Sequence, residues 1–125
     1  MTETLLAIVD DLFFLSKIQQ AAKLVGVGVE QATPGNVAER AEQFHVRGVI
    51  LDLNHRSGAA VDTLRRLKTD VKTRATRVIG FLSHVQTDLA AGAREAGCDL
   101  VLARSTFSQR LPELLRELRG PGRET

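Results

Sequence analysis

The chain has 125 residues, of which 43% are hydrophobic and 26% charged, and its formal net charge at pH 7 is +2. These values are typical of one globular domain with a single core. No apolar run approaches the roughly 20 residues that a membrane-spanning helix needs, and the first residues lack the basic segment of a secretion signal. Cys98 is the single cysteine, so no internal disulfide is possible. We therefore expect a cytoplasmic protein without membrane contact.

Basic residues cluster in one stretch, where only Asp62 and Asp70 counter them. The basic members are Arg65, Arg66, Lys68, Lys72, Arg74 and Arg77. A nucleic-acid-binding surface combines such charge with stacking aromatics or a groove-binding motif. The chain offers neither and has no Trp or Tyr, so we expect no direct binding to nucleic acid. We interpret the stretch as a solvated helix face, with docking of an acidic ligand or protein as the alternative.

The first half of the chain alternates short apolar runs with amphipathic stretches. Residues 5–9 form a continuous apolar run, which is typical of a strand buried on both faces. A helix follows, with Gly26 placed to end it, and residues 27–31 predict a second strand. Thr33 and Pro34 then predict the cap and the first turn of a second helix. The apolar stripes consist of Phe14, Ile18, Ala21, Ala22 and Val25 in the first helix and of Val37, Ala41 and Phe44 in the second.

The second half repeats this alternation. Residues 46–53, 78–82 and 100–103 predict three further strands. After the fourth strand, Thr87 predicts the cap of an alanine-rich helix that Gly97 ends, and in the last helix Pro112 fits only the first turn. The stripes of the third and the last helix consist of Val61, Leu64, Leu67 and Val71 and of Leu111, Leu114, Leu115 and Leu118.

Five strand–helix pairs with short connections predict an α/β fold, with a parallel sheet covered by helices on both faces. The length suits the doubly wound, flavodoxin-like strand order 2-1-3-4-5. The periodic pattern predicts one domain over residues 1–119, followed by a disordered tail at residues 120–125.

Ligands of such sheets bind outside the carboxyl ends of the strands, so the polar residues at those ends are the candidates for a functional site. They are Asp10 and Asp11 after the first strand, Asp52 and Asn54 after the third, Ser83 after the fourth and Arg104 after the fifth. The first and third strands are neighbours in the expected order, which brings three carboxylates to one edge. Like charges this close either raise a pKa or bind a cation, and an oxygen-rich set without thiolates suits Mg²⁺.

A cation at this edge allows an anionic phosphoryl group to approach an anionic aspartate. Asp52 is then placed to attack phosphorus and to hold the group as an acyl phosphate. Ser83 is placed to donate a hydrogen bond to a phosphoryl oxygen, and Arg104 to neutralise the added charge.

These residues resemble the response-regulator receiver domain, the CheY-like family. The resemblance rests on the acidic pair after the first strand, on Asp52, on Ser83, on a cation after the fifth strand and on residues 95–99, and it spans roughly residues 4 to 119. It implies Mg²⁺ held by Asp10, Asp11, Asp52 and the backbone carbonyl of Asn54. It also implies a stand-alone, non-enzymatic receiver in a phosphorelay, phosphorylated on Asp52 by a histidine kinase or a phosphotransfer protein, that acts on a downstream protein and that can dimerise.

The chain departs from the family's pattern at several positions. Arg104 and Ser105 stand where the family has a near-invariant Lys and usually a Pro. Val101 stands where a switching Tyr or Phe is common, and the loop at residues 54–58 is short and lacks the usual proline. These departures favour an alternative function, in which the chain is a phosphorylation-independent pseudo-receiver that binds a protein.

Several alternatives at the site stay open on the sequence alone. Arg104 can pair with Asp52 or Asp11 in a purely structural ion pair that blocks metal. His55 and His84 can join Asp52 in a transition-metal site, although two histidines on separate loops are a poor signal for one. A flavin carrier needs a small, neutral loop after the first strand to cradle phosphate, whereas this loop is acidic and bulky. A phosphatase of the haloacid-dehalogenase type needs an aspartate at position 13 if Asp11 is its nucleophile, and Phe13 stands there.

Overall fold

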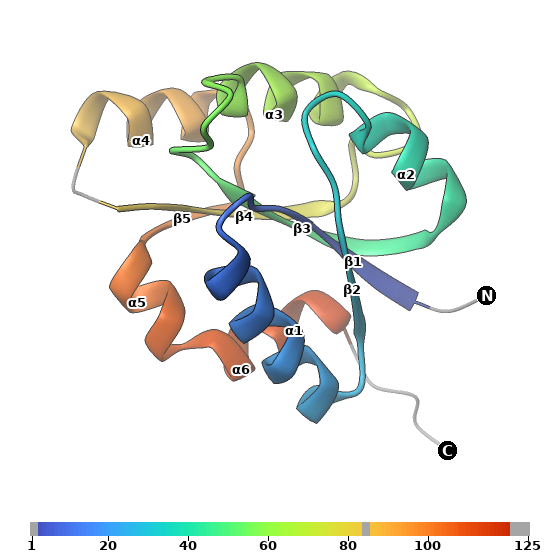
Figure 1. Cartoon of the computed structure of the whole chain (residues 1–125). Coiled ribbons are helices and arrows are strands. Elements are labelled where there is room, and N and C mark those ends of the chain that lie inside the picture. Colours follow the sequence, from blue (N-terminus) through green and yellow to red (C-terminus); the bar gives the residue numbers. More distant parts are fainter. Residues whose placement is uncertain (1–2, 84–85, 121–125) are drawn as a thin grey trace.

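The computed structural model describes residues 3–83 and 86–120 and contains one five-stranded parallel sheet in the order β2-β1-β3-β4-β5 (Figure 1). The predicted fold and strand order are confirmed. The strands are β1 (Glu3–Ile8), β2 (Gly28–Gln31), β3 (His45–Asp52), β4 (Arg77–Leu82) and β5 (Leu100–Ala103). The helices are α1 (Leu12–Val25), α2 (Val37–Gln43), α3 (Ala60–Thr69), α4 (Thr87–Glu95), α5 (Arg104–Gln109) and α6 (Leu111–Arg119).

Helices cover both faces of the sheet, with α1, α5 and α6 on one face and α2, α3 and α4 on the other (Figure 1). This arrangement follows from strand periodicity, because successive side chains of a strand point to opposite faces. Leu5 and Ala7 of β1 therefore pack in one hydrophobic cluster, and Leu6 and Ile8 pack in the other. Both sets are fully buried, which is why β1 reads as a continuous apolar run rather than an alternating one.

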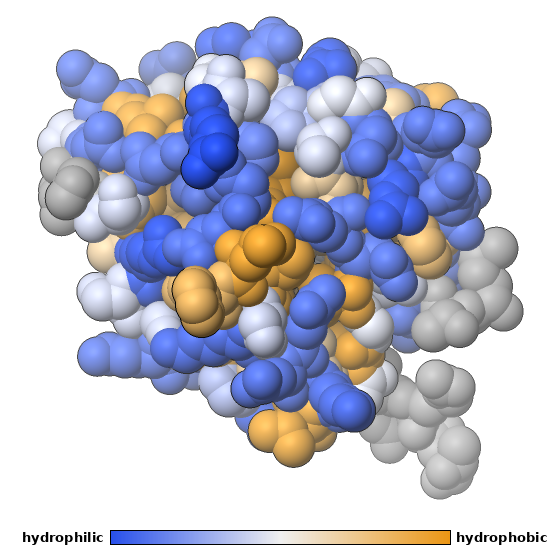
Figure 2. All heavy atoms as spheres, viewed as in Figure 1, coloured by the Kyte–Doolittle hydropathy of each residue, from blue (hydrophilic) through white to orange (hydrophobic). Residues whose placement is uncertain are grey.

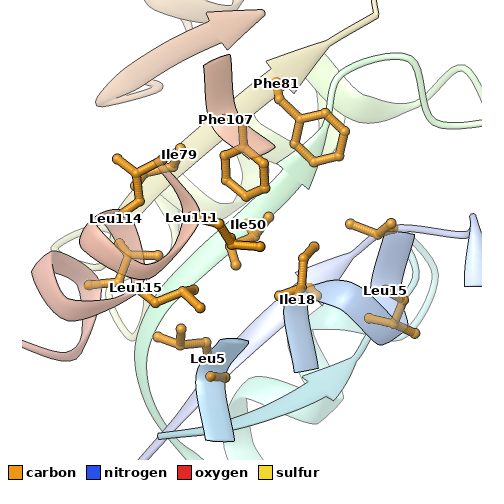
Figure 3. Packing of buried hydrophobic residues seen from close by; sticks show 14 of the residues in the cluster. Leu5, Leu15, Ile18, Ile50, Ile79, Phe81, Phe107, Leu111, Leu114 and Leu115 are labelled. Atoms are coloured by element: carbon orange, nitrogen blue, oxygen red, sulfur yellow. The ribbon is translucent and has the colours of Figure 1, made fainter. Parts of the chain in front are cut away.

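The cluster beneath α1, α5 and α6 contains three phenylalanine rings. Phe81 and Phe107 stack with their ring centroids 4.9 Å apart, and Phe14 lies 5.0 Å from Phe81 (Figure 3 shows Phe81 and Phe107). Each ring comes from a different element, α1, β4 or α5, so the cluster joins the first helix to the end of the chain. Aromatic contacts of this kind add about 0.5–1.5 kcal/mol per pair beyond the area that they bury.

Helix α1 ends at the glycine that the sequence predicts, and an aspartate caps its start. The Asp11 side chain accepts a hydrogen bond from the Phe14 amide, which otherwise has no partner within the helix. Gly26 ends the helix in the left-handed region, at φ 80°, where a residue with a Cβ is strained. The cap at Asp11 matters for the site, because it ties the end of β1 to the first turn of α1.

The cap of α4 is Gln86 and not the predicted Thr87, and two further sequence predictions are wrong at helix ends. Helix α2 begins at Val37 rather than at Pro34, because Thr33 and Asn36 exchange side-chain-to-amide hydrogen bonds and form a turn before the helix. Helix α3 ends at Thr69, so Val71 is 71% exposed instead of continuing the buried stripe. A local hydrogen-bonded turn replaces helix in both places, and apolar spacing cannot detect such turns.

The last predicted helix is present, and a short helix that was not predicted precedes it. α6 carries the predicted leucine stripe, with Pro112 in its first turn as expected. The preceding segment forms the short helix α5, which the sequence did not predict and which buries Phe107 fully. Arg104 is the first residue of α5, so its backbone follows directly from β5. Residues 121–125 of the predicted tail lie outside the described residues.

None of the described helices is long and apolar enough to cross a membrane.

The close contact between β3 and α6 makes Gly48 sensitive to substitution. A Cβ at this position meets the Leu118 side chain at 2.8 Å, and both residues are buried. We expect Gly48→Ala to lower the free energy of unfolding by about 1–3 kcal/mol, the usual effect of overpacking a core. Gly92→Ala is the matched control, because its Cβ meets nothing within 4 Å in α4, and it should stabilise the protein by about 0.5–1 kcal/mol. Urea denaturation of both variants measures the two effects, and equal stabilities would contradict the packing described here.

Candidate functional site

The carboxyl ends of the strands form an open cleft of about 610 Å³. All the side chains proposed from the sequence for the acidic site line this cleft together, and Leu12 and Arg56 join them. The lining residues are Asp10, Asp11, Leu12, Asp52, Asn54, Arg56, Ser83 and Arg104. The parallel register explains the convergence, because it pairs Ile8 of β1 with Leu51 of β3 and so places the two acidic strand ends side by side. The roles assigned to these residues remain predictions.

Asp52 is the last residue of β3 and is only 6% exposed. Its Oδ1 accepts a hydrogen bond of 2.9 Å from the backbone amide of Asn54. Burial raises the pKa of the Asp52 carboxyl above its ordinary value of 3.8, while the Asn54 amide and the positive charge of Arg104 oppose this rise. Among the described residues, no side chain donates a hydrogen bond to this carboxylate.

Asp11 has both of its carboxylate oxygens engaged. Oδ1 accepts the helix-capping bond of 3.1 Å from the Phe14 amide, and Oδ2 accepts a bond of 2.8 Å from Nη2 of Arg104. The Phe14 amide and, next to it, the Arg104 guanidinium hold the pKa of Asp11 below its ordinary value. Asp11 and Asp52 therefore have opposite pKa shifts, because only Asp11 has hydrogen bonds that outweigh its desolvation.

Arg104 lies between the Asp11 carboxylate and the aromatic cluster of Phe14, Phe81 and Phe107. Its guanidinium carbon is 4.1 Å from the centre of the Phe14 ring and 5.8 Å from that of Phe81. A planar guanidinium stacks on such a ring while its edge donates hydrogen bonds, a combination that a lysine ammonium cannot make. The open alternative of an ion pair between Arg104 and Asp11 is what the structure contains.

Asn54 connects the loop after β3 to the loop after β4. Its Oδ1 accepts bonds from the Ser83 amide at 2.7 Å and from the Ser83 hydroxyl at 3.2 Å, and its Nδ2 donates to Oε1 of Gln86 at 2.7 Å. The resemblance gave a role only to the backbone carbonyl of Asn54, so the sequence analysis missed that its side chain connects the two loops. The hydroxyl predicted to bind a phosphoryl oxygen is thus engaged by Asn54 in this structure.

Other charged or polar loop residues differ in how firmly they are held. Arg56 pairs with Asp10 at 3.4 Å, but its side chain is 89% exposed, so this pair contributes little. His55 contacts Ser57 within its own loop at 2.9 Å, and His84 lies outside the described residues. Apart from charge, no sequence signal distinguishes Arg56 as a residue of the cleft.

The donor set can be tested for its fit to a divalent cation. Among the described residues, no three side chains of His, Cys, Asp or Glu lie together as metal ligands. Each Asp11 oxygen already accepts one hydrogen bond, Oδ1 from the Phe14 amide and Oδ2 from Arg104. As arranged here, the positive charge of Arg104 lies against Asp11 and competes with a divalent cation for this carboxylate. The prediction of Mg²⁺ therefore needs a test of its own.

Comparisons with known proteins identify the fold. No protein-family model and no curated protein sequence matches the chain. Many solved structures do match, including a chain from Chloroflexus aurantiacus J-10-fl assigned as a response regulator, with a TM-score of 0.83, 16% identity and coverage of 97% of this chain and 100% of that one.

Two other similar structures are the chemotaxis response regulator CheY4 of Vibrio cholerae and the Mn²⁺-bound form of the response regulator Rcp1. CheY4 has a TM-score of 0.80 and 13% identity, and the match covers 94% of this chain and 99% of that one. Rcp1 has a TM-score of 0.76 and 12% identity, with 98% and 99% covered. The chain thus has the CheY-like receiver fold predicted from its sequence, and its chemistry has to be argued from its own residues.

The opposite pKa shifts at the two carboxylates predict opposite effects on stability. The Asp52 carboxyl binds its proton more tightly in the folded than in the unfolded protein. The protonated carboxyl therefore stabilises the fold below the ordinary pKa of 3.8, and this stabilisation is lost as the pH rises through the raised pKa of the folded state. We therefore expect Asp52→Asn to be more stable than the wild type at pH 7 and to lose this advantage in acid. Asp11, with its lowered pKa, contributes stability above its ordinary pKa, so Asp11→Asn should be less stable at pH 7. Urea denaturation between pH 3 and pH 7 measures both, and the same sign for the two variants would contradict this interpretation.

The stacking of Arg104 predicts that lysine is a poor substitute. Arg104→Lys keeps the charge but loses the planar contact with Phe14, so we expect the free energy of unfolding to fall by about 0.5–2 kcal/mol. Arg110→Lys is the matched control, because Arg110 pairs only with exposed Glu113 at 3.5 Å, and it should be close to neutral. Thermal and urea denaturation of the two variants provide the comparison. A neutral Arg104→Lys would show that the ring contact contributes nothing.

Proposed function

We propose that this chain is a receiver-fold signalling module that acts by contact with a protein partner and keeps its acidic site closed with Arg104. In this proposal the module is cytoplasmic and non-enzymatic, and its signalling does not depend on phosphorylation of Asp52. The CheY-like fold supports the signalling role, and the chemistry of the cleft supports independence from phosphate.

The observation that carries the proposal is the 2.8 Å bond between Arg104 and Asp11, supported by the ring of Phe14 4.1 Å away. The guanidinium supplies the positive charge that the clustered carboxylates require. Opening the site to a metal means breaking a charge-assisted hydrogen bond and a cation–π contact together. A lysine at this position has no comparable contact with the ring, so replacing lysine by arginine favours the closed arrangement.

The switching elements support the same proposal. Ser83 is bound through its amide and hydroxyl to Asn54, and Val101 in β5 has no aromatic ring that could rotate between two positions. A module whose switch residues are engaged within the domain presents one surface to its partner. Such a module resembles a fixed docking platform more than a two-state switch.

A second candidate function has one observation in its favour. Asp52 lines the cleft together with Ser83 and Arg104, and among the described residues its carboxylate accepts a hydrogen bond from the Asn54 amide alone. An aspartate so placed is free to act as a phosphoacceptor, with a histidine kinase or a phosphotransfer protein as the donor and Mg²⁺ as the cofactor. This candidate requires Arg104 to leave Asp11.

Phosphorylation is the direct test of the two candidates. The protein is incubated with Mg²⁺ and acetyl phosphate, and the added phosphoryl group is sought by intact mass, with Asp52→Asn as the control. We expect no label on the wild-type protein and no change in its amide NMR spectrum on adding beryllium fluoride and Mg²⁺. Label on the wild type that disappears in Asp52→Asn would reject the proposal in favour of the phosphoacceptor.

Arg104→Lys shows whether the guanidinium itself closes the site. If it does, the lysine variant gains label while the wild-type protein remains unlabelled, and Arg110→Lys behaves like the wild type. Titration with Mg²⁺, followed by the amide signals of residues 10–12, should likewise show tighter binding in Arg104→Lys. Equal Mg²⁺ affinity in the two proteins would contradict the role given to Arg104.

A further inference from the structure

Another pocket lies between α2 and α3, on the face of the sheet opposite α1 (Figure 1). Its volume is about 340 Å³, and it shares no lining residue with the cleft at the strand ends. A small-molecule site typically has about 300–1,000 Å³, so this pocket has room for one compact ligand. A pocket between α4 and β5 has only about 160 Å³. The residues that line the larger pocket are Val37, Ala38, Arg66, Leu67, Thr69, Asp70 and Thr73.

The pocket lies where two helices are shorter than their apolar spacing predicts. Helix α2 begins at Val37 and α3 ends at Thr69, and both residues line the pocket. Val71, which a longer α3 would place in its buried stripe, is exposed instead. The turns that replace helix at these two ends therefore shape the pocket.

Two contacts between the helical segments border the pocket. On one side, Nη2 of Arg66 donates to the backbone carbonyl of Pro34 at 3.2 Å. On the other side, Nζ of Lys72 donates to Oε2 of Glu42 at 2.9 Å. Pro34 precedes Ala38 by four residues and Glu42 follows it by four, so each contact lies about one helical turn from the pocket. An extended peptide or a long helix needs a groove that continues past such contacts, whereas a bordered pocket suits a small molecule.

The floor of the pocket is apolar and buried. Val37 and Leu67 belong to the hydrophobic cluster on this face of the sheet. The hydroxyl of buried Thr73 donates to the backbone carbonyl of Leu67 at 2.6 Å, so its proton is already engaged. Above this floor the surface is different: Figure 2 shows mostly hydrophilic atoms over α2 and α3, with hydrophobic atoms only in small areas. The floor thus favours the apolar part of a ligand whose polar part stays at the surface.

Two opposite charges, Arg66 and Asp70, stand at the edge of this floor. The backbone amide of Asp70 donates to the carbonyl of Arg66 at 3.1 Å, which places the two residues one helical turn apart. They do not pair with each other. Arg66 pairs with Asp62 at 3.8 Å, and this pair is weak because both side chains are exposed. Oδ1 of Asp70 accepts a hydrogen bond of 2.9 Å from the Lys72 amide, and within the described part of the chain Asp70 has no ion pair.

We propose that this pocket binds a free apolar α-amino acid. The apolar side chain of the ligand packs on Val37 and Leu67, its carboxylate binds the guanidinium of Arg66, and its ammonium group pairs with Asp70. Two opposite charges one turn apart complement a zwitterion, whereas a neutral apolar molecule would leave both without a partner. This binding goes beyond the proposed function and is independent of it, because it uses no residue of the cleft.

Titration of the whole protein with three amino acids tests the proposal. The probes are L-leucine, L-isoleucine and L-phenylalanine, and binding is followed by calorimetry and by the amide NMR signals of residues 37–38 and 66–73. We expect at least one probe to bind saturably and to shift signals at these residues rather than at residues 10–12. Glycine should bind about tenfold more weakly or worse, because it has no side chain to bury on the floor.

Variants of the lining residues show whether the pocket itself is the site. Asp70→Asn keeps an oxygen for the Lys72 amide but removes the charge, so we expect it to weaken binding about tenfold or more. Asp62→Asn is the matched control, because it removes another exposed carboxylate of α3 that does not line the pocket. Ala38→Leu fills the pocket and should abolish binding, while Ala91→Leu on exposed α4 should not. Thermal denaturation checks that each variant retains the fold.

Analogues of leucine separate a zwitterion from other occupants. L-leucinamide lacks the carboxylate and 4-methylpentanoate lacks the ammonium group, and each should bind about tenfold more weakly or worse than L-leucine. Absence of saturable binding by all three amino acids, or equal binding to the wild type and to Asp70→Asn, would overturn the proposal. N-acetyl-L-leucinamide represents a leucine within a protein chain. Binding of this neutral compound as tight as that of L-leucine would also overturn it, in favour of a docking site for an apolar side chain of a partner.

Discussion

The clustering of three carboxylates at one edge of a parallel sheet is the constraint on which this structure depends. Asp10, Asp11 and Asp52 line one cleft because β1 and β3 are hydrogen-bonded neighbours, and like charges this close either raise a pKa or attract positive charge. Arg104 supplies it from within the chain. One guanidinium bonds to Asp11 and stacks on Phe14, so charge neutralisation and hydrophobic packing meet in a single side chain.

This contact links distant parts of the chain. Arg104 begins α5 directly after β5, whereas Asp11 and Phe14 belong to the start of α1. The stacked rings of Phe81 and Phe107 continue the link into the core. The polar closure of the site and the aromatic packing beneath it therefore stabilise one another, and a change at residue 104 affects both the cleft and the first turn of α1.

The chain shows how one fold can form from very different sequences. Its backbone follows response regulators such as CheY4 of Vibrio cholerae at only 13% identity, because alternating strands and helices with suitable apolar periods are sufficient for the fold. The site depends on a few side chains. Arg104 binds Asp11 with the support of the Phe14 ring, and the first helix presents Leu12 at the cleft and exposed Phe13 next to it.

The sequence by itself determined the class of the fold, the strand order and most of the residues at the cleft, but not Leu12 and Arg56. These depend on periodicity and on the rule that parallel strands end at one edge, and both are readable along the chain. The sequence also allowed an ion pair with Arg104 but left its partner open between Asp11 and Asp52. Only the tertiary structure identified Asp11 as the partner of Arg104, because the position of the guanidinium depends on where the Phe14 ring lies. The start of α2, the exposure of Val71, helix α5 and the engagement of Ser83 by Asn54 likewise depend on local hydrogen bonds and on packing between distant segments, neither of which leaves a periodic signal in the sequence.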